Sequence, residues 1–317
     1  MYKGGDGMLE VIDLSKKYKQ KYAAQGINMF LEKGEIVGLL GPNGAGKSTT
    51  ISMLSSLVVP TSGDVRLLNE STIKNPQNIR KILGVVPQEI ALYTDLSAEE
   101  NLRFFGEIYR LKGAELKKRI EEVLEQIGLT DRRKDLVKTF SGGMKRRLNI
   151  GVALLHNPEI IIMDEPTVGI DPQSRNYILE AVKRLNKERG MTVLYTSHYM
   201  EEVEFLCDRI YIMDKGHIIA SGTKEELKNI LSSENTISIQ VERVKEEFIQ
   251  LLEADPTIRQ VKVLDRNVTV IVPKEYNLFQ KISQIAEETS TALISVEVKA
   301  PTLEDVFLHL TGRALRD

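Results

Sequence analysis

The chain has 317 residues, of which 42% are hydrophobic and 28% are charged, and its formal net charge is -2. This length exceeds the usual ~100–200 residues of a single domain, so we expect about two domains. The balanced charge argues against a protein that mainly grips nucleic-acid phosphates, because such domains carry a strongly basic face. We therefore expect no nucleic-acid partner.

The apolar runs are short. None approaches the roughly twenty residues needed to cross a bilayer, and the best of them, 160–163, ends at Asp164. Residues 1–7 lack the apolar core of a secretory signal. We expect a chain that does not span a membrane and stays in the cytosol. Its single cysteine, Cys207, cannot form an internal disulfide.

The first strong motif is a phosphate-binding loop. Alternating residues within 8–33 predict two strands of an antiparallel subdomain, and an apolar run at 35–40 predicts a buried strand. A helix-compatible stretch follows at 49–56. Between them the sequence matches G-x-x-x-x-G-K-[ST]. The loop residues are Gly41, Pro42, Asn43, Gly44, Ala45, Gly46, Lys47, Ser48 and Thr49.

This loop has the residue types that phosphate binding needs. Glycines let successive backbone N–H groups curl around anionic oxygens at the start of a helix. We expect Lys47 to reach the β- and γ-phosphates and Ser48 to place its hydroxyl on Mg²⁺. The alternative is a glycine turn that merely opens a structural helix. It would not explain why Lys47, Ser48 and Thr49 follow the glycines.

Further along the chain, Gln88 follows the strand-like run 85–87. Its neutral amide is suited to bind Mg²⁺ or the attacking water, while its backbone hinges the insertion that follows. Charged residues interleaved with apolar ones at helical spacing over 97–128 predict helices. We expect a helical subdomain over about 88–158.

Ser141, Gly142 and Gly143 open an apparent helix at 144–155. A serine hydroxyl, backbone N–H groups and the positive end of a helix dipole together suit an anion. The alternative is a routine helix start. We favour a second phosphate-binding end because it follows a phosphate loop in the same chain.

An alternating pattern then resumes, with a strand at 160–163, a helix at 173–189, a strand at 192–196, a helix at 200–207 and a strand at 210–213. Such alternation predicts a parallel sheet flanked by helices, which is an α/β fold.

Polar residues follow two of these strands. Asp164 and Glu165 emerge at the carboxyl end of the first, where open α/β sheets bind ligands. Asp164 is expected to organise Mg²⁺, and Glu165 to accept a proton from the attacking water. His198 follows the next strand and is expected to donate a hydrogen bond to the γ-phosphate.

The remaining histidines, His156, His217 and His309, have no cysteine or carboxylate partners at ligand spacing, so Mg²⁺ is the only metal that the sequence implies.

From residue 236 onwards the order of predicted elements is β-α-β-β-α-β, with a last helix near 303–310. This order predicts a small α+β ferredoxin-like domain. The predicted limits are 8–228 for the first domain, 229–235 for a linker and 236–317 for the accessory domain.

These motifs together resemble the nucleotide-binding subunit of an ATP-binding cassette (ABC) transporter. The resemblance covers about 8–228 and implies a P-loop NTPase cassette that hydrolyses ATP with Mg²⁺. It is carried by 41–49, Gln88, Ser141, Gly142, Gly143, 160–165, Asp171 and His198.

The resemblance also implies the partners of the site. Tyr18 is the residue expected to stack on adenine. Two cassettes would bind head to tail, as a homodimer or a heterodimer. Ser141, Gly142 and Gly143 of one would then contact the γ-phosphate held by the other, and Asp171 would cross the interface.

Two positions depart from the commonest family form, because Phe140 stands where leucine is usual and Met144 where glutamine is usual. The departure bears on the fine geometry or the rate of hydrolysis, because the backbone donors and Ser141 remain.

The C-terminal part is similar to ATPase subunits of the daunorubicin-resistance-like export branch. The implied function is to couple ATP hydrolysis to drug or antibiotic efflux through a separate permease, at the cytoplasmic face of the membrane. Sodium or lipid export and a non-transport ABC ATPase stay as alternatives. A P-loop kinase or GTPase would have no need of Ser141, Gly142 and Gly143.

Overall fold

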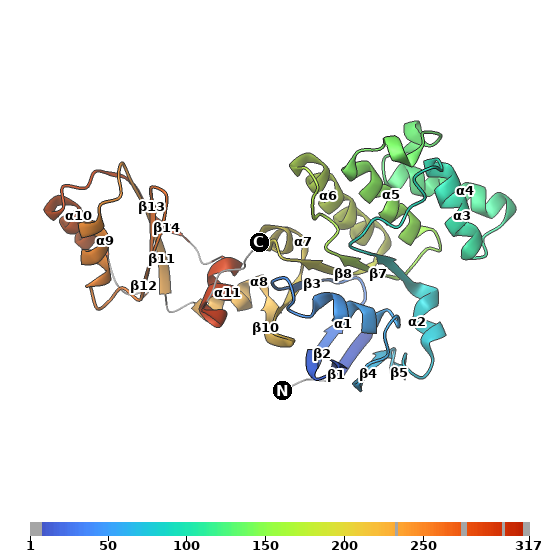
Figure 1. Cartoon of the computed structure of the whole chain (residues 1–317), viewed down its shortest axis with the longest axis horizontal. Coiled ribbons are helices and arrows are strands. Elements are labelled where there is room, and N and C mark those ends of the chain that lie inside the picture. Colours follow the sequence, from blue (N-terminus) through green and yellow to red (C-terminus); the bar gives the residue numbers. More distant parts are fainter. Residues whose placement is uncertain (1–7, 232–233, 274–277, 300–301, 313–317) are drawn as a thin grey trace. The chain divides into compact units, whose positions relative to one another are not determined.

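The computed structural model describes residues 8–231, 234–273, 278–299 and 302–312. The chain divides into two compact units, one before and one after the step from Thr223 to Lys224 (Figure 1). Helix α8 (Lys224–Lys228) is grouped with the second unit, in which it packs with α11 (Leu303–Thr311). The domain limits expected at 228 and 236 stay a prediction.

The first unit begins with an antiparallel sheet in the order β2-β1-β4-β5. Buried residues recur along β1, where Leu9, Val11 and Leu14 pack into the core. The two strands expected within 8–33 are therefore confirmed. Strands β4 and β5 and the short helix α2 were not predicted from the sequence. The bounds are β1 Leu9–Tyr18, β2 Lys21–Leu31, β4 Ser62–Leu67, β5 Glu70–Ser71 and α2 Pro76–Ile82.

The second sheet of this unit has six strands in the order β10-β9-β3-β8-β7-β6. Five of them run parallel, and β10 pairs antiparallel with β9. The carboxyl ends of β3, β7 and β8 therefore meet at one edge of the sheet. The bounds are β3 Ile36–Leu40, β6 Leu83–Val86, β7 Ile160–Asp164, β8 Thr192–Ser197, β9 Arg209–Asp214 and β10 His217–Thr223.

Three helices follow parallel strands and complete the α/β layer: α1 (Lys47–Leu54), α6 (Pro172–Arg189) and α7 (Met200–Leu206). Of these, α1 begins at Lys47, so the phosphate loop leads directly into its first turn. The expected α/β cassette is confirmed.

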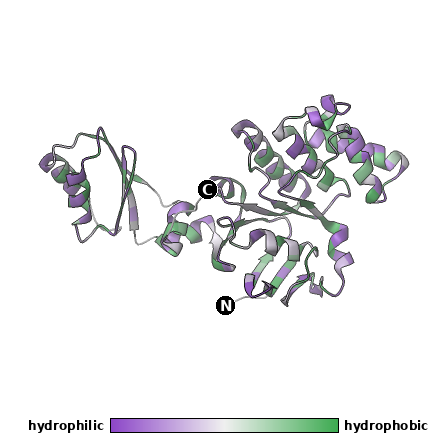
Figure 2. Cartoon of the chain, in the orientation of Figure 1, coloured by the Kyte–Doolittle hydropathy of each residue, from purple (hydrophilic) through white to green (hydrophobic). Residues whose placement is uncertain are grey.

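The helical insertion forms one end of this unit (Figure 1). It consists of α3 (Ala98–Ile108), α4 (Gly113–Gln126) and α5 (Gly142–Leu154), with short 3-10 turns between α4 and α5. Figure 2 shows hydrophilic and hydrophobic residues mixed along these helices. Helices α3 and α4 are amphipathic, whereas most residues of α5 are buried. Helix α5 begins two residues before the expected start at Met144, so Gly142 and Gly143 lie in its first turn.

The second unit contains an antiparallel sheet in the order β12-β13-β11-β14, with α9 and α10 packed on one face over a core of its own. This is the expected ferredoxin-like arrangement, although residue 277, where the second helix was expected to start, lies outside the described residues. The bounds are β11 Glu234–Val241, α9 Glu246–Glu253, β12 Gln260–Leu264, β13 Asn267–Pro273, α10 Phe279–Glu288 and β14 Leu293–Lys299.

Within the described ranges, no helix has both the length and the apolar character needed to span a bilayer.

Candidate functional site

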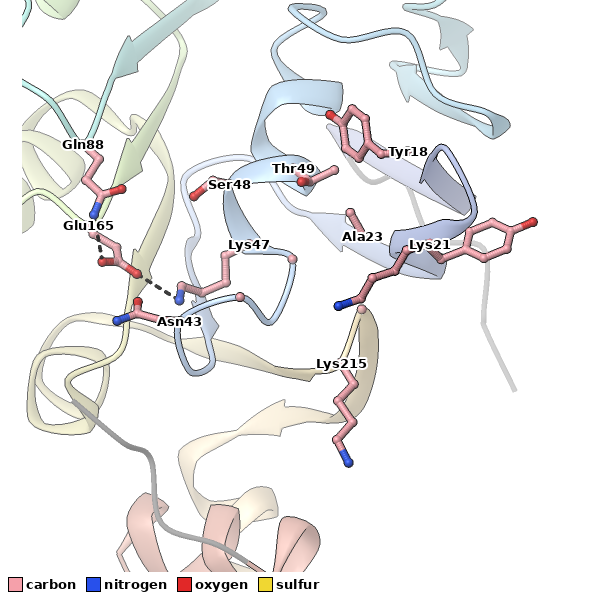
Figure 3. Close-up of a pocket in the computed structure, with 14 residues that line it drawn as sticks. Tyr18, Lys21, Ala23, Asn43, Lys47, Ser48, Thr49, Gln88, Glu165 and Lys215 are labelled. Carbon is pink, nitrogen blue, oxygen red and sulfur yellow. Dashed lines mark hydrogen bonds and ion pairs between the residues drawn. The ribbon is translucent and has the colours of Figure 1, made fainter.

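A cavity of about 540 Å³ lies over the phosphate loop. Figure 3 shows Lys47 reaching from the loop to Glu165, with Gln88 beyond that carboxylate and Tyr18, Ala23 and Lys21 at the other end. The cavity is lined by Tyr18, Lys21, Tyr22, Ala23, Asn43, Gly44, Gly46, Lys47, Ser48, Thr49, Gln88, Glu165, Lys215 and Gly216.

The backbone of the phosphate loop explains why positions 44 and 46 are glycines. Both have positive φ angles, 78° and 107°, which residues with a side chain adopt at a cost. A Cβ atom at Gly46 would also overlap the carbonyl oxygen of Ala23. These glycines are thus required by the path of the loop, which leaves the unpaired N–H groups at the start of α1 available for an anion.

Lys47 is almost fully buried, and its ammonium group is nevertheless satisfied. Nζ donates to the carbonyl oxygens of Gly41 at 2.8 Å and Pro42 at 3.2 Å. It also forms an ion pair with Glu165 Oε1 at 2.9 Å. A buried cation is tolerated when it is paired in this way.

Glu165 is the centre of the predicted catalytic residues. Its second oxygen, Oε2, lies 3.2 Å from His198 Nδ1 and 3.5 Å from Gln88 Nε2. The residue has a positive φ of 45°, a rare conformation for a glutamate. Its backbone N–H donates to Thr196 Oγ1 at 2.9 Å, which holds the conformation in place. The structure therefore brings Lys47, Gln88, Glu165 and His198 together.

Asp164 ends β7 beside this cluster but does not line the cavity. It accepts a hydrogen bond from Thr196 Oγ1 at 2.9 Å. Asp164, the hydroxyl of Ser48 and the amide oxygen of Gln88 would offer a metal ion oxygen ligands only. Such hard ligands fit Mg²⁺, which binds one or two carboxylates together with phosphate oxygens.

Arg146 joins the helical insertion to the site and was missed by the sequence reasoning. This buried residue of α5 donates to the carbonyl oxygens of Pro87 at 2.8 Å and Gln88 at 2.6 Å. Burial lowers the pKa of its guanidinium below the ordinary value. The position of Gln88 thus depends on the helix that Ser141 begins.

The second predicted phosphate-binding end is well formed but lies outside the cavity. Ser141 Oγ accepts from the N–H of Met144 at 3.2 Å and caps α5. Asp171 caps α6 and accepts from the N–H of Ser174 at 2.9 Å, which lowers the pKa of the Asp171 carboxyl. Neither these two residues nor Gly142 and Gly143 line the cavity.

Three loop residues predicted to bind nucleotide also lie behind the lining: Gly41, Pro42 and Ala45. The carbonyl of Ala45 accepts from the N–H of Gly216 at 2.9 Å, so the turn between β9 and β10 is fixed against the loop. This contact explains how Lys215 and Gly216 reach the cavity. No signal in the sequence pointed to them.

Comparison with known proteins identifies the family. The family model described as ABC transporter matches residues 24–168. The linearmycin resistance ATP-binding protein LnrL of Bacillus subtilis is 51% identical over 98% of this chain and 100% of its own length. The chain belongs to the ABC transporter family. The daunorubicin/doxorubicin resistance ATP-binding protein DrrA of Streptomyces peucetius is 35% identical over 98% of this chain and 94% of its own.

Solved ABC cassettes match about two thirds of the chain or slightly more. The dimeric, post-hydrolysis cassette MJ0796 bound to ADP and Pi is 30% identical, with a TM-score of 0.62 over 68% of this chain and 98% of that one. The cbiO1 subunit from Clostridium perfringens is 29% identical, with a TM-score of 0.66 over 72% of this chain and 94% of that one. This ABC protein is therefore an ATPase, and not a P-loop kinase or a GTPase.

Lys21 offers a test of the cavity lining that the sequence did not predict. Removing its charge with Lys21→Ala should weaken ATP binding about three- to tenfold, or ~0.7–1.4 kcal/mol, because Lys21 adds positive potential to an anion site. A titration with a fluorescent ATP analogue measures the change. Lys19→Ala is the control, because Lys19 belongs to the same hairpin but does not line the cavity. Equal losses in both variants would contradict the assignment.

Proposed function

We propose that this ATPase powers the efflux of an antibiotic or a similar drug through a separate membrane permease, at the cytoplasmic face of the membrane. The observation that carries the proposal is the 51% identity to a linearmycin resistance protein over nearly the whole of both chains. Because that match includes the C-terminal unit, it is more specific than the cassette alone. Selectivity for the exported compound resides mainly in the permease.

Export of other cargo by the same mechanism is the second candidate. A Nod factor export ATP-binding protein I of Ralstonia nicotianae is 34% identical over 99% of this chain and 97% of its own. Relatives of similar identity thus carry names with different cargoes, and sodium or lipid export stays an alternative for this chain.

The proposed chemistry assigns a role to each residue of the cluster around Glu165. Lys47 exchanges its ion pair with Glu165 for the β- and γ-phosphates of ATP, and the freed carboxylate accepts a proton from the attacking water. His198 donates to the γ-phosphate, and Gln88 orients the water. Mg²⁺ held by Ser48, Gln88 and Asp164 would neutralise phosphate charge. Tyr18 lies at the mouth of the cavity, exposed for stacking on adenine.

The proposed active form is a dimer of two cassettes. Ser141 and Gly142 form an exposed helix start outside their own chain's cavity, Gly143 behind them is buried, and Asp171 is exposed at the start of α6. A head-to-tail partner would place these groups against the nucleotide of the other cassette. The relative MJ0796, whose solved structure is dimeric, supports this arrangement.

The role of Glu165 is tested by Glu165→Gln. ATP affinity should be kept, because the loop contacts remain, while turnover should fall by about 10²–10⁴ because the base is lost. Phosphate release and ATP titration measure the two effects. Glu159→Gln is the matched control, because this exposed carboxylate lies just before the other end of β7. Hydrolysis at the normal rate in Glu165→Gln would refute the assignment.

The shared site is tested by adding Ser141→Arg to the Glu165→Gln background. ATP should convert Glu165→Gln from monomer to dimer in light scattering, and Ser141→Arg should prevent this, because the arginine occupies the space of the partner's phosphates. Ala114→Arg adds the same charge at an exposed position of α4 and should leave the dimer intact. A double variant that still dimerises with ATP would disprove the shared site.

The cargo class is tested in cells. A deletion strain should become several-fold more sensitive to an antibiotic in a panel that includes linearmycin and daunorubicin, and only the active protein, not Glu165→Gln, should restore resistance.

Co-purification from membranes should recover one permease with the ATPase. Unchanged sensitivity across the panel, together with sensitivity to sodium, would favour the alternative.

A further inference from the structure

Glu202 is a buried carboxylate outside the nucleotide cavity. It lies in α7 and is 2% exposed. Three hydroxyl groups donate to it: Thr167 Oγ1 at 2.8 Å, Tyr195 OH at 2.9 Å and Ser197 Oγ at 2.9 Å. Arg175 Nε lies 3.4 Å from Oε1. A buried charge is costly unless it is paired and hydrogen-bonded, so these donors form a site built for a carboxylate.

The hydrogen-bond donors and the ion-pair partner of Glu202 come from segments that carry residues of the ATP site. Thr167 follows Glu165 by two residues, and Ser197 directly precedes His198. Arg175 lies in the first turn of α6, which Asp171 caps. One carboxylate on a helix therefore ties together the loop after β7, the end of β8 and the start of α6.

A second set of contacts leads from Glu202 to His198. The guanidinium of Arg175 lies 4.7 Å from the ring centre of Tyr199, whose ring lies 4.2 Å from that of His198. The N–H of Tyr199 also donates to Ser197 Oγ at 2.9 Å. Both neighbours of His198 in the sequence are thus held by Glu202 or by its partners.

The chemistry of this cluster requires an acceptor at Glu202. Burial, and then the adjacent Glu202 carboxylate, raise the pKa of Tyr195 well above its ordinary value, so the phenol keeps its proton and donates. A carboxylate only accepts hydrogen bonds, whereas the amide of glutamine would present an NH₂ group to at least one donor. Glu202→Gln therefore removes one acceptor and the charge that pairs with Arg175, at nearly constant volume.

We propose that Glu202 is a positioning residue for ATP hydrolysis: it holds the Thr167 loop against the Ser197 segment, so that His198 and Glu165 meet at 3.2 Å. The inference rests on the roles proposed for Glu165 and His198 and adds the element that sets their relative position. Glu202 itself touches no substrate.

The test compares Glu202→Gln with Glu201→Gln, an exposed carboxylate next to it on α7. In steady-state hydrolysis, Glu202→Gln should lower kcat about tenfold or more while KM and the Kd for ATP change less than about twofold. Glu201→Gln should match the unmodified protein in all three. A merely structural role would move binding and turnover together.

A second variant keeps the test independent of how Glu202→Gln folds. Thr167→Val removes one donor and should lower kcat in the same way, with ATP affinity kept. In the Thr167→Val/Glu202→Gln double variant the two effects should not multiply, because both disturb the same contact between α7 and the loop after β7. Thermal unfolding with and without ATP confirms that each variant is folded.

The proposal is overturned by any of three results: kcat within about twofold of normal in either single variant, a KM that rises in proportion to the loss of kcat/KM, or effects that multiply in the double variant. Failure of the catalytic assignment is a separate outcome, because it appears as normal turnover in Glu165→Gln whatever Glu202→Gln does.

Discussion

The convergence of three parallel strands on one carboxylate is the constraint on which the ATP site depends. Strands β3, β7 and β8 end at the same edge of the sheet, so the phosphate loop, Glu165 and His198 meet although they are far apart in the sequence. Glu165 binds Lys47 with one oxygen and lies near His198 and Gln88 with the other. Any shift in strand register would separate these groups, because each is attached to its strand within a few residues.

Two buried charged residues connect this site to the surrounding helices. Arg146 fixes the backbone of Gln88 from the helical insertion, and Glu202 fixes the segments next to Glu165 and His198 from α7. Each of these charges is costly to bury and is stabilised only when all its partners are in place. Such contacts favour one arrangement of the site over similar ones, which is what positioning for catalysis requires.

In the described part of the chain, two helix starts carry the residue types predicted to bind anions, and they lie at different distances from the cavity. Helix α1 begins at Lys47 under the cavity, whereas α5 begins outside it, capped by Ser141. Because the N-terminus of a helix attracts anions over only a short distance, an anion at the second start would have to be brought by another molecule. The proposed shared site in a dimer would account for both.

The sequence by itself determined the phosphate loop, most of the strands and helices and the ferredoxin-like accessory unit, because glycine spacing, apolar periodicity and acidic strand ends are local signals. It did not predict β4, β5 or α2. It predicted Lys47, Gln88, Glu165 and His198 as one site, and the structure brings them together. Only the tertiary structure decided the contacts of Arg146 and Glu202, and the approach of Lys21 and Lys215 to the cavity. A lone charged residue in a helix or turn carries no local pattern, and its partners are chosen by the packing of segments that the sequence keeps apart.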